Sequence, residues 1–167
     1  MCLKGLVIAG IATLMFTSGC RVSKPGRMET LAVTWAKHNI TVKGRNNRNP
    51  VPGTADKIES GKQAFGFYCV VCHGRDGQNT GVPFADKVSP PIPSLMSPQV
   101  QSYTDGQLKW IIENGIAPSG MPASKGILSD DDMWAIVHFI RHLPPAGSLG
   151  EPRTYTGDEY QNAGSDR

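Results

Sequence analysis

The sequence lacks the patterns that mark several large classes of protein. It contains no convincing run of alternating apolar and polar residues and no internal repeat, so neither a sheet fold nor a repeat array is indicated. Its apolar run at residues 5–16 is shorter than the roughly 20 residues that a transmembrane helix needs. The formal net charge is only +3, and no aromatic residues interleave with the basic residues at 43–48. Nucleic acid is therefore not an expected partner.

Cysteine is scarce, with four residues in a chain of 167. Cys2 and Cys20 belong to an N-terminal segment in which Lys4 precedes the apolar run, which is typical of an export signal. The end of this segment resembles a bacterial lipoprotein cleavage site, although Thr17 stands where such sites prefer Leu. We expect residues 1–19 to be a signal peptide and Cys20 to be lipidated. The alternatives are ordinary cleavage and an uncleaved anchor.

Helical periodicity accounts for most of the remaining chain. Spaced apolar residues predict a short amphipathic helix over 28–42, and the Gly, Pro and Asn residues that follow indicate a linker up to residue 54. Residues 20–54 would thus form a membrane tether, a short helix and a linker. The C-terminal segment 145–167 is rich in Gly, polar and charged residues, and we expect it to be a flexible, poorly ordered tail.

Three further helices are predicted within a packed domain at residues 55–144. The first begins after Thr54, a candidate N-cap, and runs into Cys69. The second spans 104–114, with Lys109 facing water, and the third begins at Ser129 and ends before Pro144. With no strands expected, the predicted fold class is all-α.

The residues with distinctive chemistry are Cys69-Val70-Val71-Cys72-His73. Two thiols one helical turn apart share a face, so each can add to a vinyl group of the same haem, and the adjoining His73 can reach its iron. A thioredoxin-like dithiol would need a βαβ context, and a structural zinc site would need a second ligand pair; the sequence offers neither. Inert core cysteines would leave the spacing unexplained. We predict one covalently bound haem c.

Met121 is the predicted second axial ligand. It lies in a loop between two predicted helices, where Gly120 lets the backbone come close and Pro122 stiffens it. A thioether is a soft ligand that favours the reduced metal, so His/Met ligation raises the reduction potential. Met96 is the reserve candidate, with core packing as its alternative role. The other candidates have other expected places. Met28 and His38 precede the domain, Met133 is expected to pack in the core, and His138 and His142 are expected on a helix surface.

These motifs, in their order and spacing, resemble a class I c-type cytochrome of the bacterial monohaem kind over about residues 55–144. Gly61 and Phe65 stand eight and four residues before Cys69, as in the first helix of that family, where the small residue lets the last helix cross closely. Ile136 and Phe139 match the packing partners on that last helix. The resemblance implies the cytochrome c fold, with about three core helices around one haem and an N-terminal helical extension.

The same resemblance extends to the haem pocket. Pro93-Ser94-Leu95 resembles the Pro-x-Leu segment of the family, which implies that the Pro93 carbonyl accepts the ring proton of His73 and that Leu95 packs on the haem. Gly120-Met121-Pro122 resembles the distal ligand loop.

The expected function is single-electron transfer. If protein residues fill both axial positions, the iron has no open site for a substrate, so we expect no enzyme activity of the chain itself. Expected partners are redox proteins, namely a membrane reductase, an oxidase or a dehydrogenase whose cytochrome subunit this chain would be. The expected location is the periplasm or the outer face of a bacterial membrane. The alternatives are a haem-based sensor with a labile Met121 and a haem peroxidase with an open iron.

Overall fold

The computed structural model describes residues 26, 28, 32, 35, 36, 40–117 and 119–153. The chain divides into two units, residues 1–35 and residues 36–167, and every element named below belongs to the second. The predicted signal peptide, Cys20 and most of the predicted helix at 28–42 lie outside the described residues.

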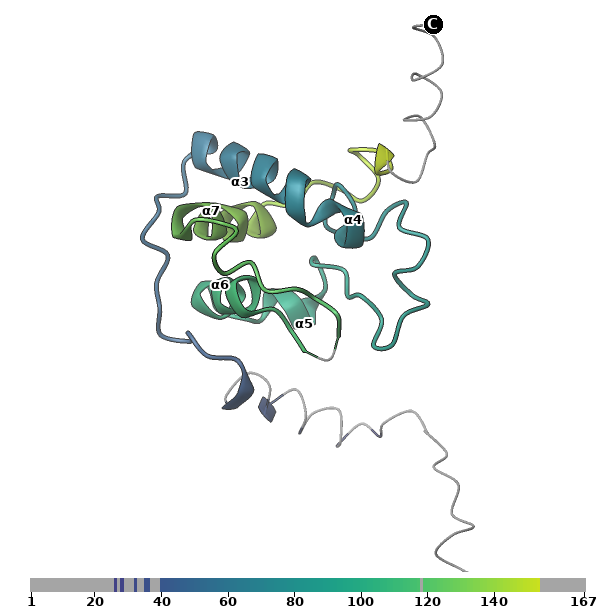
Figure 1. Cartoon of the computed structure of the whole chain (residues 1–167), viewed down its shortest axis with the longest axis horizontal. Helices are drawn as coiled ribbons and strands as arrows, with labels where there is room; N and C mark the ends of the chain where they lie inside the picture. Colours follow the sequence, from purple (N-terminus) through teal and green to yellow (C-terminus); the bar gives the residue numbers. More distant parts are fainter. Residues whose placement is uncertain are drawn as a thin grey trace, which may run out of the picture. The chain divides into compact units, whose positions relative to one another are not determined.

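The described part of the second unit is helical (Figure 1). Its helices are α3 (Ala55–Tyr68), α4 (Val70–His73), α5 (Pro98–Gln101), α6 (Asp105–Asn114) and α7 (Asp130–Arg141). The described residues form no strand, and their only extended pairing is two isolated bridges, Ile116 with Met121 and Lys125 with Leu128. The prediction of an all-α fold is confirmed. Within the same residues, no helix has the length and apolar character needed to cross a membrane.

Local hydrogen bonds explain where α6 and α7 begin. The Thr104 hydroxyl accepts the Gln107 N–H at 3.3 Å, and the Gln107 side chain accepts the Thr104 N–H at 3.1 Å, which is a capping box. Ser129 accepts the N–H of Asp132 at 3.1 Å, and three aspartates occupy the first turn of α7, next to the positive end of the helix dipole. Both helices therefore begin where the sequence predicted.

Helix α7 is the centre of the domain and packs against α3 and α6 (Figure 1). Gly61 marks the crossing of α3 and α7, because a Cβ atom at this position would lie 2.0 Å from the carbonyl oxygen of Ala135. Ile136 is fully buried, and the rings of Phe65 and Phe139 lie 5.1 Å apart between their centroids. The predicted close crossing at Gly61 is confirmed.

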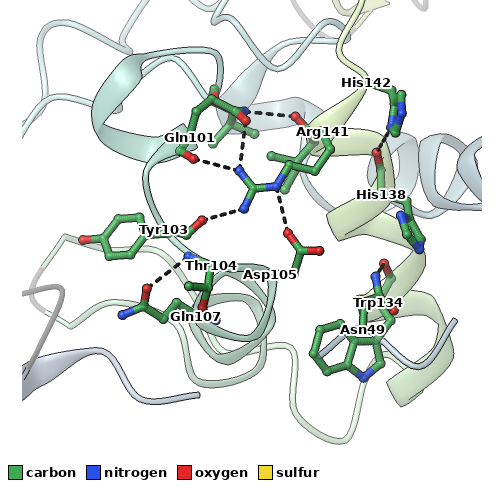
Figure 2. A network of polar contacts seen from close by, with 12 residues as sticks. Asn49, Gln101, Tyr103, Thr104, Asp105, Gln107, Trp134, His138, Arg141 and His142 are labelled. Carbon is green, nitrogen blue, oxygen red and sulfur yellow. Dashed lines mark hydrogen bonds and ion pairs between the residues drawn. The ribbon is translucent and has the colours of Figure 1, made fainter. Parts of the chain in front are cut away.

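Arg141, at the end of α7, forms hydrogen bonds with residues from the end of α5 to the start of α6 (Figure 2). Its Nε donates to Asp105 Oδ1 at 2.8 Å, its Nη1 donates to the carbonyl oxygen of Gln101 at 2.9 Å, and its Nη2 donates to the carbonyl oxygen of Tyr103. The planar guanidinium presents several donors at fixed angles, so one side chain satisfies all three acceptors.

Lys109 does not face water as the helical pattern suggested. Its side chain is only 12% exposed, and its Nζ lies 3.0 Å from Glu113 Oε2 and 3.0 Å from Asp130 Oδ1. Glu113 is one turn further along α6, whereas Asp130 belongs to α7, so this second partner depends on how the two helices pack.

Residues 43–54, which were predicted to form a linker, contact two helices of the domain. The backbone of Gly44 crosses α6 at Gly106, where a Cβ atom would lie 2.1 Å from the Gly44 carbonyl oxygen. Val51 is buried, and its carbonyl oxygen lies 2.8 Å from Nε2 of His138 on α7. This stretch therefore lacks helical periodicity yet packs on α6 and α7, through its backbone and through the side chains of Asn49 and Val51.

Residues 145–153 are also ordered against the domain, although they were expected to belong to a poorly ordered tail. The N–H of Gly147 donates to the carboxylate of Asp76 at 2.7 Å, and Pro152 is buried. The composition of this segment does not predict its packing, because the acceptor that holds it, Asp76, lies far away in the sequence. The rest of the predicted tail, residues 154–167, lies outside the described residues.

Candidate functional site

The two cysteines lie where α3 ends and α4 begins. The N–H of Cys69 donates to the Phe65 carbonyl at 2.8 Å, and the carbonyl of Cys69 then accepts the N–H groups of Cys72 at 3.1 Å and His73 at 2.9 Å. Both cysteines are half-buried, and neither forms a disulfide. One tight turn thus holds two free thiols and an imidazole, as the spacing predicted.

The imidazole of His73 is largely enclosed by the protein. Its ring lies 6.4 Å from that of Phe65 between centroids, at a tilt of 45°. Burial lowers the pKa of His73 to about 4, so the ring is neutral near pH 7, the form that binds metals. Its Nδ1 is buried and has no hydrogen-bond partner among the described residues.

The thiol of Cys69 is unlike that of a reactive cysteine. Burial, with a further contribution from the neighbouring Cys72, raises the pKa of Cys69 to about 12. Catalytic and redox-active cysteines have lowered pKa values, because the thiolate is the reactive form. The environment of Cys69 therefore does not favour a dithiol oxidoreductase.

The loop that carries Met121 is closed against the end of α6. The N–H of Ile116 donates to the Met121 carbonyl at 3.1 Å, and the N–H of Ser124 donates to the Ile112 carbonyl at 3.1 Å. Gly115 turns the chain at a φ of +68°, and a Cβ atom there would lie 2.5 Å from the Met121 carbonyl oxygen. The side chain of Met121 is half-buried and packs on the hydrophobic core of the domain.

Three of the predicted site residues converge on that core. Cys69, Leu95 and Met121 come from separate segments, yet all three pack against the cluster of buried side chains from α3, α6 and α7. Phe65, which faces the ring of His73, belongs to the same cluster. The fold thus brings the predicted attachment point and the predicted distal ligand to one body of apolar side chains.

The competing ligand candidates are placed differently. Met96 is 43% exposed, whereas Met133 is 3% exposed inside the core, which confirms its predicted packing role. His142 is exposed, and its Nδ1 lies 2.8 Å from the His138 carbonyl. Met28 belongs to the first unit, and His38 lies outside the described residues.

The segment predicted to line the pocket is fixed by the loop that follows His73. The N–H of Leu95 donates to the Gly77 carbonyl at 2.8 Å, and Nδ2 of Asn79 donates to the Ile92 carbonyl at 2.8 Å. Pro93 is exposed, and the expected bond from His73 Nδ1 to its carbonyl is not formed. The segment around Pro93 is instead held by the bonds of Ile92, which precedes it, to Asn79 and of Leu95, two residues after it, to Gly77.

The residues present fit a covalently attached haem. The site offers two unpaired thiols one turn apart, a neutral, half-buried imidazole whose buried Nδ1 has no partner among the described residues, and a thioether that packs on the same core. Thiols for attachment with nitrogen and sulfur donors for iron are the groups that hold haem in c-type cytochromes with His/Met ligation.

Asp76, in the loop after His73, has a role that no sequence pattern indicates. Its side chain is fully buried, and its Oδ2 accepts the Thr80 hydroxyl at 2.5 Å and the Gly147 N–H at 2.7 Å. Its Oδ1 accepts the N–H of Gln78 at 2.9 Å, a turn typical of Asp before Gly. The Asp-Gly pair indicates the turn but not the burial, which depends on the distant Gly147.

The central part of the chain matches a known family. The family model described as "Cytochrome C oxidase, cbb3-type, subunit III" matches residues 56–140. A comparison with curated proteins gives no match. Among solved structures, a reducing HAO-like protein complex of Kuenenia stuttgartiensis is similar over 56% of this chain and 46% of that chain, with 21% identity and a TM-score of 0.47. This chain therefore spans less than half the length of that solved chain.

Proposed function

Because the chain belongs to the family of the cbb3-type cytochrome c oxidase subunit III, a family of c-type cytochrome domains, we propose that it is a single-electron carrier. In this proposal one haem c is attached to Cys69 and Cys72, and His73 and Met121 are its axial ligands. The observation that carries the proposal is that Cys69, Leu95 and Met121 pack on one core, whose Phe65 also contacts the half-buried ring of His73.

The protein residues have separable roles in this arrangement. Cys69 and Cys72 fix the cofactor to the turn between α3 and α4, which leaves the adjacent His73 little freedom in reaching the iron. The low pKa of His73 keeps its ring neutral, so no proton has to leave before it binds. The bridge between Ile116 and Met121 holds the distal loop in place. Bound haem supplies an iron that gains or loses one electron without exchanging ligands.

The proposed setting is the outer face of a bacterial membrane. The apolar run at 5–16 and the small residues before Cys20 support export and a lipid or signal anchor. The partners would be a membrane reductase and an oxidase, or a dehydrogenase of which this chain is the cytochrome subunit.

The first test of the proposal is the visible spectrum of the purified holoprotein and its methionine variants. We expect a low-spin spectrum whose long-wavelength sulfur-to-iron band is lost in Met121→Ala and retained in the matched variant Met96→Ala. Mass spectrometry should find haem covalently attached to the wild type and not to a Cys69→Ser, Cys72→Ser double variant. A band that persists in Met121→Ala would show that another residue binds the iron.

A second experiment separates a carrier from a sensor or an enzyme. Stopped-flow mixing with bacterial membranes should show reduction by a quinol-linked donor and reoxidation by an oxidase. Rapid binding of carbon monoxide by the reduced wild type would instead favour a sensor, and peroxide turnover at an appreciable rate would favour a peroxidase, because both require an open position on the iron.

A further inference from the structure

Asp76 is the only charged residue of the described part whose side chain is buried. None of the ion pairs formed by the described residues includes it. Burying a carboxylate without a cation is costly, and proteins accommodate it by hydrogen bonds or by taking up a proton. Here three donors reach the two oxygens, from Thr80, Gln78 and Gly147.

These donors keep the buried side chain ionised. Burial favours the protonated acid, but the hydrogen bonds from Thr80, Gly147 and Gln78 outweigh that effect and lower the pKa of Asp76 below its ordinary value. At neutral pH, Asp76 therefore places a full negative charge inside the domain.

The charge lies close to the proposed iron ligand along the chain. Asp76 follows His73 by three residues, so their Cα atoms are at most about 11 Å apart. The loop closes back on His73, because the N–H of Asn79 donates to the His73 carbonyl at 2.8 Å. The same loop also contacts the predicted pocket segment, because the N–H of Leu95 donates to the carbonyl of Gly77. The carboxylate is thus built into the loop that borders the haem site.

We propose that Asp76 lowers the reduction potential of the haem iron through its buried negative charge, and that the C-terminal segment takes part by donating the Gly147 N–H. The inference rests on the proposed function. Oxidised iron carries one more positive charge than reduced iron, so a fixed anion nearby stabilises the oxidised state. Water screens this interaction weakly in the interior of a protein. The effect opposes that of Met121, which favours the reduced iron.

The test is a potentiometric titration of the purified holoproteins of wild type, Asp76→Asn and Asp86→Asn. Asp86 is an exposed carboxylate of the same connection between α4 and α5, so its variant makes the same change in net charge. We expect the equilibrium constant for one-electron reduction to rise at least threefold in Asp76→Asn, which is about 28 mV at 59 mV per tenfold, and less than threefold in Asp86→Asn. The proposal would be overturned if the equilibrium constant for reduction of Asp76→Asn stayed within threefold of the wild-type value, or if both variants shifted it equally.

A third variant separates the charge from the packing of the loop. Thr80→Val removes one of the donors that keep Asp76 ionised, so we expect it to lose stability. Its potential should be raised only on the acidic side of a titration over pH, where Asp76 takes up a proton, and should equal or fall below that of the wild type on the alkaline side, where the carboxylate is ionised in both proteins. A potential of Thr80→Val that stays raised on the alkaline side would overturn the proposal even if Asp76→Asn failed to fold. Absence of haem from the wild type would refute the proposed function, whereas a normal His/Met spectrum with no effect of Asp76→Asn would refute only this inference.

Discussion

Replacing Gly61 with alanine should weaken the fold at the crossing of α3 and α7. The added Cβ would lie 2.0 Å from the carbonyl oxygen of Ala135 and 2.4 Å from its carbonyl carbon. Both are backbone atoms of α7, so no side-chain rotation relieves the overlap and the two helices must move apart. Overpacking of this kind costs about 3 kcal/mol at the upper end of its usual range.

The helical preference of alanine offsets part of that cost. Alanine in place of a helical glycine contributes about 1 kcal/mol, which leaves a net loss of about 2 kcal/mol for Gly61→Ala. Gly66 provides the matched control on the same helix, because nothing lies within 4 Å of a Cβ placed there and its φ is not positive. Gly66→Ala should therefore stabilise the protein by about 0.4–1 kcal/mol.

Urea unfolding of the two holoproteins at constant temperature measures both effects. We expect the midpoints to move in opposite directions at an unchanged m value, and the Tm of Gly61→Ala to fall by about 10 °C. The reasoning would be refuted if Gly61→Ala unfolded at the same midpoint as the wild type, or if both variants shifted in one direction, because α7 would then leave room for a side chain at position 61.

Three further predictions concern side chains of the core and its border. Met133→Ala should cost about 2–5 kcal/mol in urea unfolding, because Met133 is 3% exposed, yet it should retain the sulfur-to-iron band. Arg141→Lys should cost about 1–3 kcal/mol, because an ammonium cannot reach all the acceptors of the guanidinium; an unchanged unfolding midpoint would contradict the network in Figure 2. Burial disfavours the charge of Lys109, but its hydrogen bonds to two carboxylates outweigh this and raise its pKa. Since the folded pKa exceeds the unfolded one, the stability advantage of the wild type over Lys109→Gln should be full below the ordinary pKa of 10.5 and decline as pH rises through the folded value. A constant advantage from pH 9 to about 12 would contradict this assignment.

The long helices and the turn that carries Cys69, Cys72 and His73 could be predicted because their determinants are local. Thr104 and Ser129 cap helices within three residues of themselves, and the spacing of Cys69, Cys72 and His73 follows from one helical turn. The close approach at Gly61 was also predicted, but through the resemblance to a family and not through any pattern in the helix itself. A glycine inside a helix does not by itself reveal which backbone it contacts.

The two ends of the domain show the limit of such reasoning. Residues 43–54 and 145–153 have the composition of linkers. They nevertheless pack on the domain, because some of their polar groups bond to partners far away in sequence. Their order depends on the shape of surfaces that exist only after α6, α7 and the loop after His73 have packed.

By itself, the sequence determined the helical class, the helix starts and the residues proposed to bind haem and iron. Only the tertiary structure decided that Cys69, Leu95 and Met121 share one core, that Lys109 pairs across helices and that Asp76 is buried. The physical reason is the range of the interactions. Helix capping and motif spacing act over a few residues, whereas burial and cross-chain hydrogen bonds depend on groups that folding brings together from distant positions.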